Sequence, residues 1–304
     1  MCTAVTYLGK SRCFGRNLDL EHPYGEQVIL TPRNFPLNFR CARPLRGHYA
    51  MLGMAHLRVG YPLYYDGMNE RGLAMAGLRF PGHAAYYPYH AGADNVTPFE
   101  LIPWVLGQCA DLGEVKALMG SVNLLDQAFS PELSLTPLHW MAADGEEALV
   151  IEPMGDGLRV YDAPVGVLTN SPPFDWQMTN LSQFMAVSNE PPRNPFASGL
   201  GLPGDLSSPS RFVRAAFFRK NSPAGLSEEE SVSQLFHILN NVAQPKGGER
   251  TVYTACCDLS RGIYFYTTYE NSRPTAVALT PERLDGGGLL TWPMREKPDI
   301  LWES

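Results

Sequence analysis

The second residue of the chain is a cysteine, in the stretch MCTAVTY, and this position allows a particular chemistry. Removal of an initiator methionine is favoured when the next residue is small, so we expect a mature chain that lacks Met1 and begins with Cys2. Such a residue carries a thiol and a free α-amine, whose pKa of about 7.7–8.0 allows it to accept and return protons near neutral pH. Cys2 could therefore supply both the nucleophile and the base.

A structural alternative for Cys2 is a small apolar residue at the start of a buried strand. The segment GRNLD favours the catalytic interpretation, because it places Arg16 and Asp19 on or just beyond the second strand of the hairpin that Cys2 begins. A cation near sulfur lowers a thiol pKa, and a carboxylate near the amine fixes its orientation. As isolated residues, Arg16 and Asp19 would more often form a surface ion pair of little energetic value.

The elements that must position these residues are short strands. CTAVTYL (2–8) and RCFGRN (12–17) flank the turn-rich GKS, which predicts a hairpin that carries Cys2 at one strand end. Similar apolar runs with turn punctuation recur along the chain. Further strands are expected at 26–31, 49–57, 62–68, 72–80, 138–144, 148–153, 158–162, 165–170, 251–258, 262–269 and 275–280.

Capping signals predict helices between the strand blocks. Thr97 and Glu100 of TPFE form a capping box with proline at the first helical position, and Asp111 starts a second helix. Ser227 and Glu230 form another capping box ahead of an amphipathic run. Strands and helices in blocks, without regular βαβ alternation, indicate an α+β fold in which helices cover antiparallel sheets.

The chain is expected to form one domain over residues 1–304. The stretch 188–211 is rich in proline, glycine and serine, and composition does not change across it. We therefore interpret it as a long functional or assembly loop rather than an interdomain linker.

The composition excludes several classes of partner. The chain has 304 residues, 44% of them hydrophobic, and a net charge of −7, and its 24 lysines and arginines form no basic run. Nucleic acid and anionic membranes are therefore not expected as partners. No apolar stretch approaches the ~20 residues of a membrane helix, and residues 1–15 lack the layout of a secretory signal, so we expect a soluble, cytoplasmic protein.

The cysteines and histidines give no sign of a metal site or of a cofactor. The six cysteines contain no C-x-x-C pair, and the seven histidines contain no H-E-x-x-H spacing. Reduced thiols in a reducing compartment fit this pattern. A redox or metal role for Cys256 and Cys257 is an alternative, but TACCDL lies in a strand-like run where buried cysteine is ordinary.

Eight segments of the chain, in family order over nearly its whole length, resemble the choloylglycine hydrolases. These are the conjugated bile salt hydrolases of gut bacteria and their penicillin V acylase relatives. The resemblance implies a four-layer αββα sandwich of the N-terminal-nucleophile hydrolase type, hydrolysis of glycine- or taurine-conjugated bile acids through a cysteine thioester, and a homotetramer clasped through the region of residues 188–211. The segments are MCT, FGRNLD, DGMNERGLAMAGL, LHWM, GVLTNSPPFDW, LPGDLSSPSRFVRAAF, FHILNNVA and GIYFYTTYEN.

The resemblance also implies roles for individual residues. Cys2 would be the nucleophile with Arg16 and Asp19 beside it. Asn170 of VLTN would donate to the oxyanion through its side chain, and Arg211 of SPSRF would line the site as a further charged residue. In the structural alternatives, Asn170 before SPP is a turn residue and Arg211 faces solvent after a serine cap.

Arg79 departs from the family pattern. The bile salt hydrolases usually read LNFPG where this chain reads LRFPG, and the penicillin acylases carry tyrosine at that position. The resemblance implies that the backbone N–H of residue 79 completes the oxyanion hole, and a backbone donor survives a change of side chain. We hypothesise that the Arg79 guanidinium favours an anionic leaving group such as taurine or glycine.

A steroid acyl group requires a broad apolar pocket. Candidate walls are Leu18 and Leu20, which bracket Asp19, together with Tyr86 and Tyr87 of the loop after Arg79. These tyrosines could instead pack the loop onto the body of the protein. Two other functions stay open: an amidase for penicillin V or N-acyl homoserine lactones, and a catalytically silent binding or structural homologue.

Overall fold

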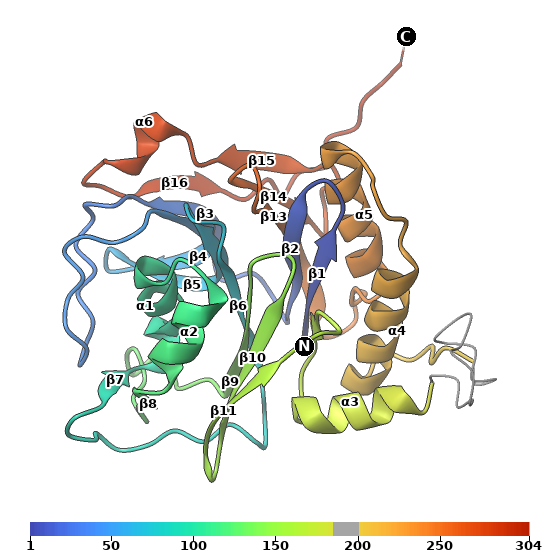
Figure 1. Cartoon of the computed structure of the whole chain (residues 1–304). Coiled ribbons are helices and arrows are strands. Elements are labelled where there is room, and N and C mark those ends of the chain that lie inside the picture. Colours follow the sequence, from blue (N-terminus) through green and yellow to red (C-terminus); the bar gives the residue numbers. More distant parts are fainter. Residues whose placement is uncertain (185–200, 304) are drawn as a thin grey trace.

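Two antiparallel β-sheets pack face to face at the centre of the molecule in the computed structural model, which describes residues 1–184 and 201–303 (Figure 1). Within these residues one sheet has six strands and the other eight, and neighbouring strands in both are antiparallel. Helices cover the outer face of each sheet. The architecture confirms the predicted αββα sandwich.

The six-stranded sheet contains the N-terminal hairpin. Its two strands pair with Cys2 opposite Leu18 and Ala4 opposite Arg16, as the hairpin prediction requires. Both faces of this sheet are covered, so its central strands are buried almost throughout. The strands, in spatial order, are β12 (Val167–Leu168), β1 (Cys2–Leu8), β2 (Arg12–Leu20), β13 (Arg250–Asp258), β14 (Ile263–Thr268) and β15 (Thr275–Ala278).

The eight-stranded sheet faces the hairpin and supplies the other wall of the core. Its strand order runs from the β10–β11 hairpin at one edge to the C-terminal strand at the other. The strands, in spatial order, are β11 (Gly157–Asp162), β10 (Ala148–Met154), β9 (Leu138–Ala143), β6 (Ala74–Arg79), β5 (Tyr61–Asn69), β4 (Met51–Arg58), β3 (Glu26–Thr31) and β16 (Leu290–Pro293), and a separate parallel pair joins β7 (Asp94–Val96) to β8 (Val122–Leu124).

Helices α4 and α5 cover the six-stranded sheet, and α1 and α2 cover the eight-stranded one. In the described part of the chain no helix is long and apolar enough to cross a membrane. The helices are the 3₁₀ turn η1 (Pro98–Glu100), α1 (Leu101–Gln108), α2 (Leu112–Met119), α3 (Phe174–Ser182), α4 (Ser208–Asn221), α5 (Glu228–Asn240) and α6 (Pro281–Leu284).

All three predicted N-cap residues are confirmed. The Asp111 side chain accepts a hydrogen bond from the backbone N–H of Glu114 at the start of α2, and Ser227 and Glu230 form a capping box at α5. At the third site the Thr97 hydroxyl donates to the Glu100 carboxylate, but the turn that follows is 3₁₀ and the α-helix begins only at Leu101.

The predicted assembly loop at 188–211 falls largely outside the description. Residues 188–200 lie outside the described residues, and 201–207 contain no helix or strand. The segment ends in the first turn of α4, where Ser207 is the N-cap. Its role in assembly stays a prediction.

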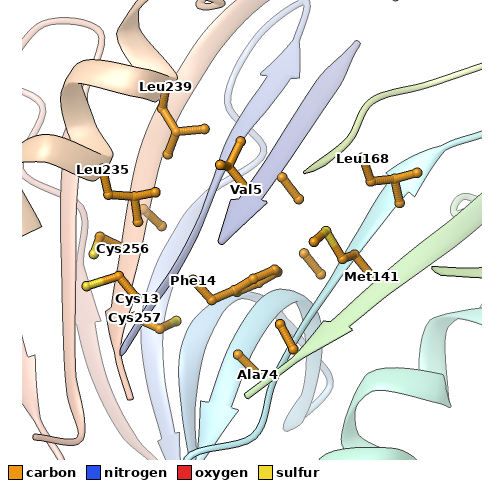
Figure 2. Packing of buried hydrophobic residues seen from close by; sticks show 14 of the residues in the cluster. Val5, Cys13, Phe14, Ala74, Met141, Leu168, Leu235, Leu239, Cys256 and Cys257 are labelled. Atoms are coloured by element: carbon orange, nitrogen blue, oxygen red, sulfur yellow. The ribbon is translucent and has the colours of Figure 1, made fainter. Parts of the chain in front are cut away.

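Aliphatic and aromatic side chains fill the space between the sheets and under α5. Figure 2 shows Phe14 of β2 pointing toward Ala74 and Met141 of the opposite sheet. On the other face of the same sheet, Leu235 and Leu239 of α5 pack on the hairpin strands. The strand that carries Arg16 and Asp19 is thus fixed from both sides.

The paired cysteines belong to this core. All six cysteines lie in the described part and are free, and burial raises the pKa of Cys256 and Cys257 well above the usual value. A thiol held neutral by burial is a poor metal ligand and nucleophile. In the described residues no group of three or more metal-ligating side chains gathers. Packing therefore accounts for Cys256 and Cys257.

Gly15 of β2 is required by the approach of α5. A Cβ built there lies 2.7 Å from Leu235 Cδ2, 3.1 Å from Leu239 Cδ1 and closer still to the Ala255 carbonyl oxygen. We predict that Gly15→Ala lowers the free energy of unfolding by about 1–3 kcal/mol, because the methyl group overpacks this contact. Urea denaturation measures it. Gly248→Ala, where a Cβ meets no described atom within 4 Å, is the control, and equal effects would contradict the prediction.

Candidate active site

Cys2 lies at the first position of β1 and is buried, with 2% of its surface exposed. Its backbone N–H donates a hydrogen bond of 2.6 Å to Asn170 Oδ1. Strand β2 holds Leu18 directly opposite. The hairpin therefore fixes the sulfur and the backbone nitrogen of one residue at the edge of the core.

Arg16 lies on the face of the hairpin that Cys2 shares, since alternate residues of a strand face the same side. It is fully buried, and its Nη1 donates to the carbonyl oxygens of Tyr65 (3.1 Å) and Gly77 (3.0 Å). Among the described residues its Nη2 has no hydrogen-bond partner. Burial lowers the pKa of Arg16, but Cys2 and Asp66 with other neighbours raise it overall, so the guanidinium stays charged beside the thiol.

Asp19 lies three residues further along β2, on the opposite face of the strand. The carboxylate is fully buried, and its Oδ1 accepts a hydrogen bond of 2.7 Å from the Thr251 hydroxyl. Its Oδ2 has no hydrogen-bond partner in the described structure. Burial raises the pKa of Asp19, against the opposing effects of Arg211 and the N-terminal ammonium.

Arg211 connects the helical layer to the first strand. Its Nη1 donates to the Cys2 carbonyl oxygen and to Thr3 Oγ1, both at 2.6 Å, and its Nη2 donates to Asn170 Oδ1 at 2.8 Å. Its Nε donates to the Leu206 carbonyl oxygen. The side chain is fully buried, so the alternative that Arg211 faces solvent is wrong.

Asn170 follows β12 and is buried against Cys2 rather than exposed in a turn. Its Oδ1 accepts from Cys2 and Arg211, and its Nδ2 donates to the Arg79 carbonyl oxygen at 2.7 Å. Its backbone N–H donates to Ser208 Oγ at 2.9 Å. With Oδ1 accepting two hydrogen bonds, the amide is oriented with its NH2 group toward the end of β6.

Arg79 ends β6 beside this amide. Its guanidinium is half-exposed and pairs with Glu249 at 2.8 Å, and Glu249 also pairs with the ammonium group of Met1. The backbone carbonyl of Arg79 thus contacts Asn170, whereas its side chain contacts Glu249. The role of its N–H as an oxyanion donor stays a prediction.

A cavity of about 580 Å³ opens beside Cys2. Leu18, Leu20, Arg79 and Glu249 line it, and a role of Leu18 and Leu20 in substrate binding stays a prediction. Its other lining residues are mostly aromatic or aliphatic. They include Tyr64, Tyr65, Phe99, Ile102, Phe129, Leu133, Leu135, Leu138 and Trp140.

Tyr86 and Tyr87, the other predicted wall residues, do not lie at this cavity. Neither tyrosine is among the described residues that line the cavity. The Tyr86 hydroxyl donates to the Thr136 carbonyl oxygen and accepts from the Leu138 N–H, and the Tyr87 hydroxyl donates to the Met154 carbonyl oxygen. These tyrosines therefore pack their loop onto the body of the protein.

Sequence reasoning missed the loop that forms a wall of the cavity. Phe129, Leu133 and Leu135 come from the irregular segment 125–137, which the strand and helix patterns left unassigned. The alternating leucines of ELSLT (132–136) are a weak signal for such a wall, because the position of a loop depends on long-range packing. A larger hollow of about 780 Å³ over α5, β13 and β14 contains none of the predicted site residues that the structure describes.

The sequence matches the family model described as linear amide C–N hydrolases, choloylglycine hydrolase family, over residues 2–292. The chain belongs to the choloylglycine hydrolase family. The buried cysteine at the start of β1 and the cavity beside it are thus features of a member of this amidase family.

Individual relatives agree with this membership. The chain is 49% identical to a bile salt hydrolase/transferase of Lactiplantibacillus plantarum, over 98% of both chains, and 35% identical to a conjugated bile acid hydrolase of Lactobacillus gasseri, over 96% of this chain and all of the relative. A crystal structure of a C2A mutant of the conjugated bile acid hydrolase from Clostridium perfringens superposes with a TM-score of 0.90 at 34% identity, over the full length of both chains. A penicillin V acylase from Agrobacterium tumefaciens, at 21% identity and a TM-score of 0.79 over 95% of this chain and 90% of its own, shares the fold.

The buried carboxyl of Asp19 gives a prediction on stability and pH. Its pKa is raised on folding, so its contribution to stability falls as pH rises from the unfolded value of about 3.9 through the folded value. Asp19→Asn removes the titrating carboxyl and with it this pH-dependent loss of stability. We expect the melting temperature of the variant, relative to wild type, to increase from about pH 4 to about pH 7.

Melting curves by circular dichroism at several pH values measure this difference. Asp126→Asn, at an exposed aspartate, controls for the change of residue type. A difference between Asp19→Asn and wild type that does not vary with pH would contradict the assignment.

Proposed function

We propose that this protein is a bile salt hydrolase that cleaves the amide bond of glycine- or taurine-conjugated bile acids through a thioester on Cys2. The observation that carries the proposal is the convergence of Cys2, Arg16 and Asn170 beside a cavity with mostly apolar walls. The relatives named above as bile salt or conjugated bile acid hydrolases, aligned over nearly the whole chain, support the same substrate class.

The proposed reaction is acyl transfer to sulfur and then to water. After loss of Met1, the Cys2 thiolate attacks the amide carbonyl, and the Asn170 amide and the residue 79 N–H stabilise the oxyanion. The α-amine of Cys2 accepts the thiol proton as the thiolate forms and then, as an ammonium group, donates it to the leaving amine; water then hydrolyses the thioester. The hydrogen bond from the Cys2 nitrogen to Asn170 Oδ1 supports this arrangement, because it orients nucleophile and oxyanion donor relative to each other.

Unpaired polar atoms at the site fit this chemistry. The Nη2 of Arg16 and the Oδ2 of Asp19 are buried without hydrogen-bond partners among the described residues. Unpaired buried polar groups are costly in a folded protein, and each calls for an explanation. We infer that Arg16 stabilises the thiolate and that Asp19 stabilises the ammonium form of the Cys2 amine.

The lining of the cavity fits the two parts of a conjugated bile acid. The apolar walls suit a steroid acyl group, which needs broad contact and few polar partners. The Arg79 guanidinium can bind the carboxylate or sulfonate of the leaving group, and it then gives up its ion pair with Glu249.

The proposal includes three further properties of the protein. A single domain is supported by the shared core between the two sheets. A cytoplasmic location is supported by six free cysteines, one of which, Cys41, is exposed. A homotetramer rests on the resemblance to the family alone.

Comparison of substrates tests the function directly. We expect turnover of glycocholate and taurocholate with a much higher kcat/KM than of penicillin V, measured by release of the free amine. Cys2→Ser should lower turnover by orders of magnitude, because a serine hydroxyl is a far weaker nucleophile than a thiol near neutral pH. Preferred cleavage of penicillin V would indicate the acylase alternative, and no turnover of any of the three would refute the proposal.

Arg79→Asn tests the leaving-group contact. A charge-assisted hydrogen bond contributes about 1.5–3 kcal/mol, so kcat/KM for glycocholate should fall roughly 10-fold or more. An uncharged cholyl glycinamide should be affected less, and the taurine-to-glycine ratio of kcat/KM should change. Arg46→Asn, at an exposed arginine that does not belong to the described lining of the cavity, is the control. An unchanged taurine-to-glycine ratio of kcat/KM in Arg79→Asn would contradict this hypothesis.

A further inference from the structure

Behind the site, His139 of β9 and Glu152 of β10 form a pair of completely buried titratable side chains. His139 Nδ1 lies 3.0 Å from Glu152 Oε1, and His139 Nε2 lies 2.8 Å from the carbonyl oxygen of Thr169. Both ring nitrogens therefore face acceptor groups. The proposed reaction uses neither residue, and neither belongs to the described lining of the cavity.

The number of protons in this pair follows from its geometry. A neutral imidazole carries one N–H and can donate to one of two acceptors. Both contacts are hydrogen bonds only if the pair holds one additional proton, either on the ring as an imidazolium or on Glu152 as a carboxylic acid that donates to Nδ1. In both cases the Nε2–H of His139 donates to the Thr169 carbonyl oxygen.

The pair contacts both segments that supply the proposed oxyanion donors. Thr169 directly precedes Asn170, so the hydrogen bond from His139 fixes the peptide that carries the amide. The His139 ring also stacks on Phe80, which directly follows Arg79, with centroids 4.3 Å apart and planes 7° from parallel. Glu152 in turn accepts a hydrogen bond of 3.0 Å from the backbone N–H of Phe174, the first residue of α3.

We propose that His139 and Glu152 are positioning residues, which hold residues 79 and 170 in the geometry that stabilises the oxyanion. This inference rests on the proposed function. The pair acts through hydrogen bonds and stacking, so a side chain that preserves the bonds preserves the activity without the charge. A displacement of about 1 Å at reacting groups can cost about 10²-fold in rate, which sets the size of the expected effect.

Two variants separate positioning from other roles. His139→Phe keeps a ring against Phe80 but loses the bond to Thr169, and we expect kcat to fall about 10²-fold with KM little changed. Glu152→Gln can donate from its amide nitrogen, at the position of Oε1, to His139 Nδ1. Its oxygen then takes the position of Oε2, which accepts a hydrogen bond of 3.2 Å from the Phe174 N–H, so its kcat should stay within a few fold of wild type. Asn170→Ala, which removes one oxyanion donor and should lose about 10²–10³ in kcat, is the reference.

Alkylation of Cys2 by iodoacetamide, followed by peptide mapping, is the second measurement. This reaction forms no oxyanion, so its rate in His139→Phe should match wild type while amide turnover falls. A wild-type kcat in His139→Phe overturns the proposal. So does a parallel loss of alkylation and turnover, which indicates general disruption, or a Glu152→Gln variant as impaired as His139→Phe.

If His139→Phe does not fold, two measurements still test the proposal. These are the kcat of Glu152→Gln and nuclear magnetic resonance of the wild-type protein with isotope-labelled histidine. The proposal requires a ring Nε2–H on His139 that exchanges slowly with solvent, and an unprotonated Nε2 overturns it. This observation needs no turnover. Failure of the wild-type enzyme to cleave bile salts would therefore refute the proposed function separately from the protonation of the pair.

Discussion

The hydrogen bonds that Asn170 and Arg211 make with Cys2 fix the first residue of β1, and the site depends on them. Asn170 Oδ1 accepts from the Cys2 nitrogen, and Arg211 donates to both the Cys2 carbonyl oxygen and Asn170. A strand end would otherwise fray, because terminal residues are poorly ordered unless they are tied down. Here these hydrogen bonds hold the end of the strand, which gives the sulfur and the backbone nitrogen of Cys2 a defined geometry.

Much of the scaffold could be predicted because its signals are local. The hairpin that joins Cys2 to Arg16 and Asp19 follows from two apolar runs around GKS, and the start of α5 follows from the capping box at Ser227. The capping box at Thr97 is also present, but the first turn after it is 3₁₀ and α1 follows it, because a cap determines where a helix begins and not whether its first turn is α or 3₁₀. Arg211 is buried partly through its hydrogen bonds to Cys2 and Thr3, which lie more than two hundred residues away in the sequence.

The walls of the cavity could not be predicted in the same way. Tyr86 and Tyr87 follow Arg79 in sequence, yet their hydroxyls bond to backbone groups of the body. Phe129 and Leu133, more than a hundred residues from Cys2, line the cavity instead. Such placements depend on how irregular loops pack, and no period or cap encodes them. The contact between His139 and Glu152 could not be predicted from the sequence either, because each is a single polar residue in an otherwise apolar strand and nothing local indicates that the two meet.

In the proposed mechanism, the nucleophilic sulfur and the proton-transferring nitrogen belong to the same residue, whose amine is exposed by loss of Met1. Arg16 and Asp19 are buried with unpaired polar atoms, which is explained if a thiolate forms near Arg16 and an ammonium group forms near Asp19. Intact-mass spectrometry with N-terminal sequencing of the protein that hydrolyses bile salts tests this claim most directly. We predict that the active chain begins with Cys2 and a free α-amine. Full activity in a protein that retains Met1, or whose α-amine is acylated, would contradict it.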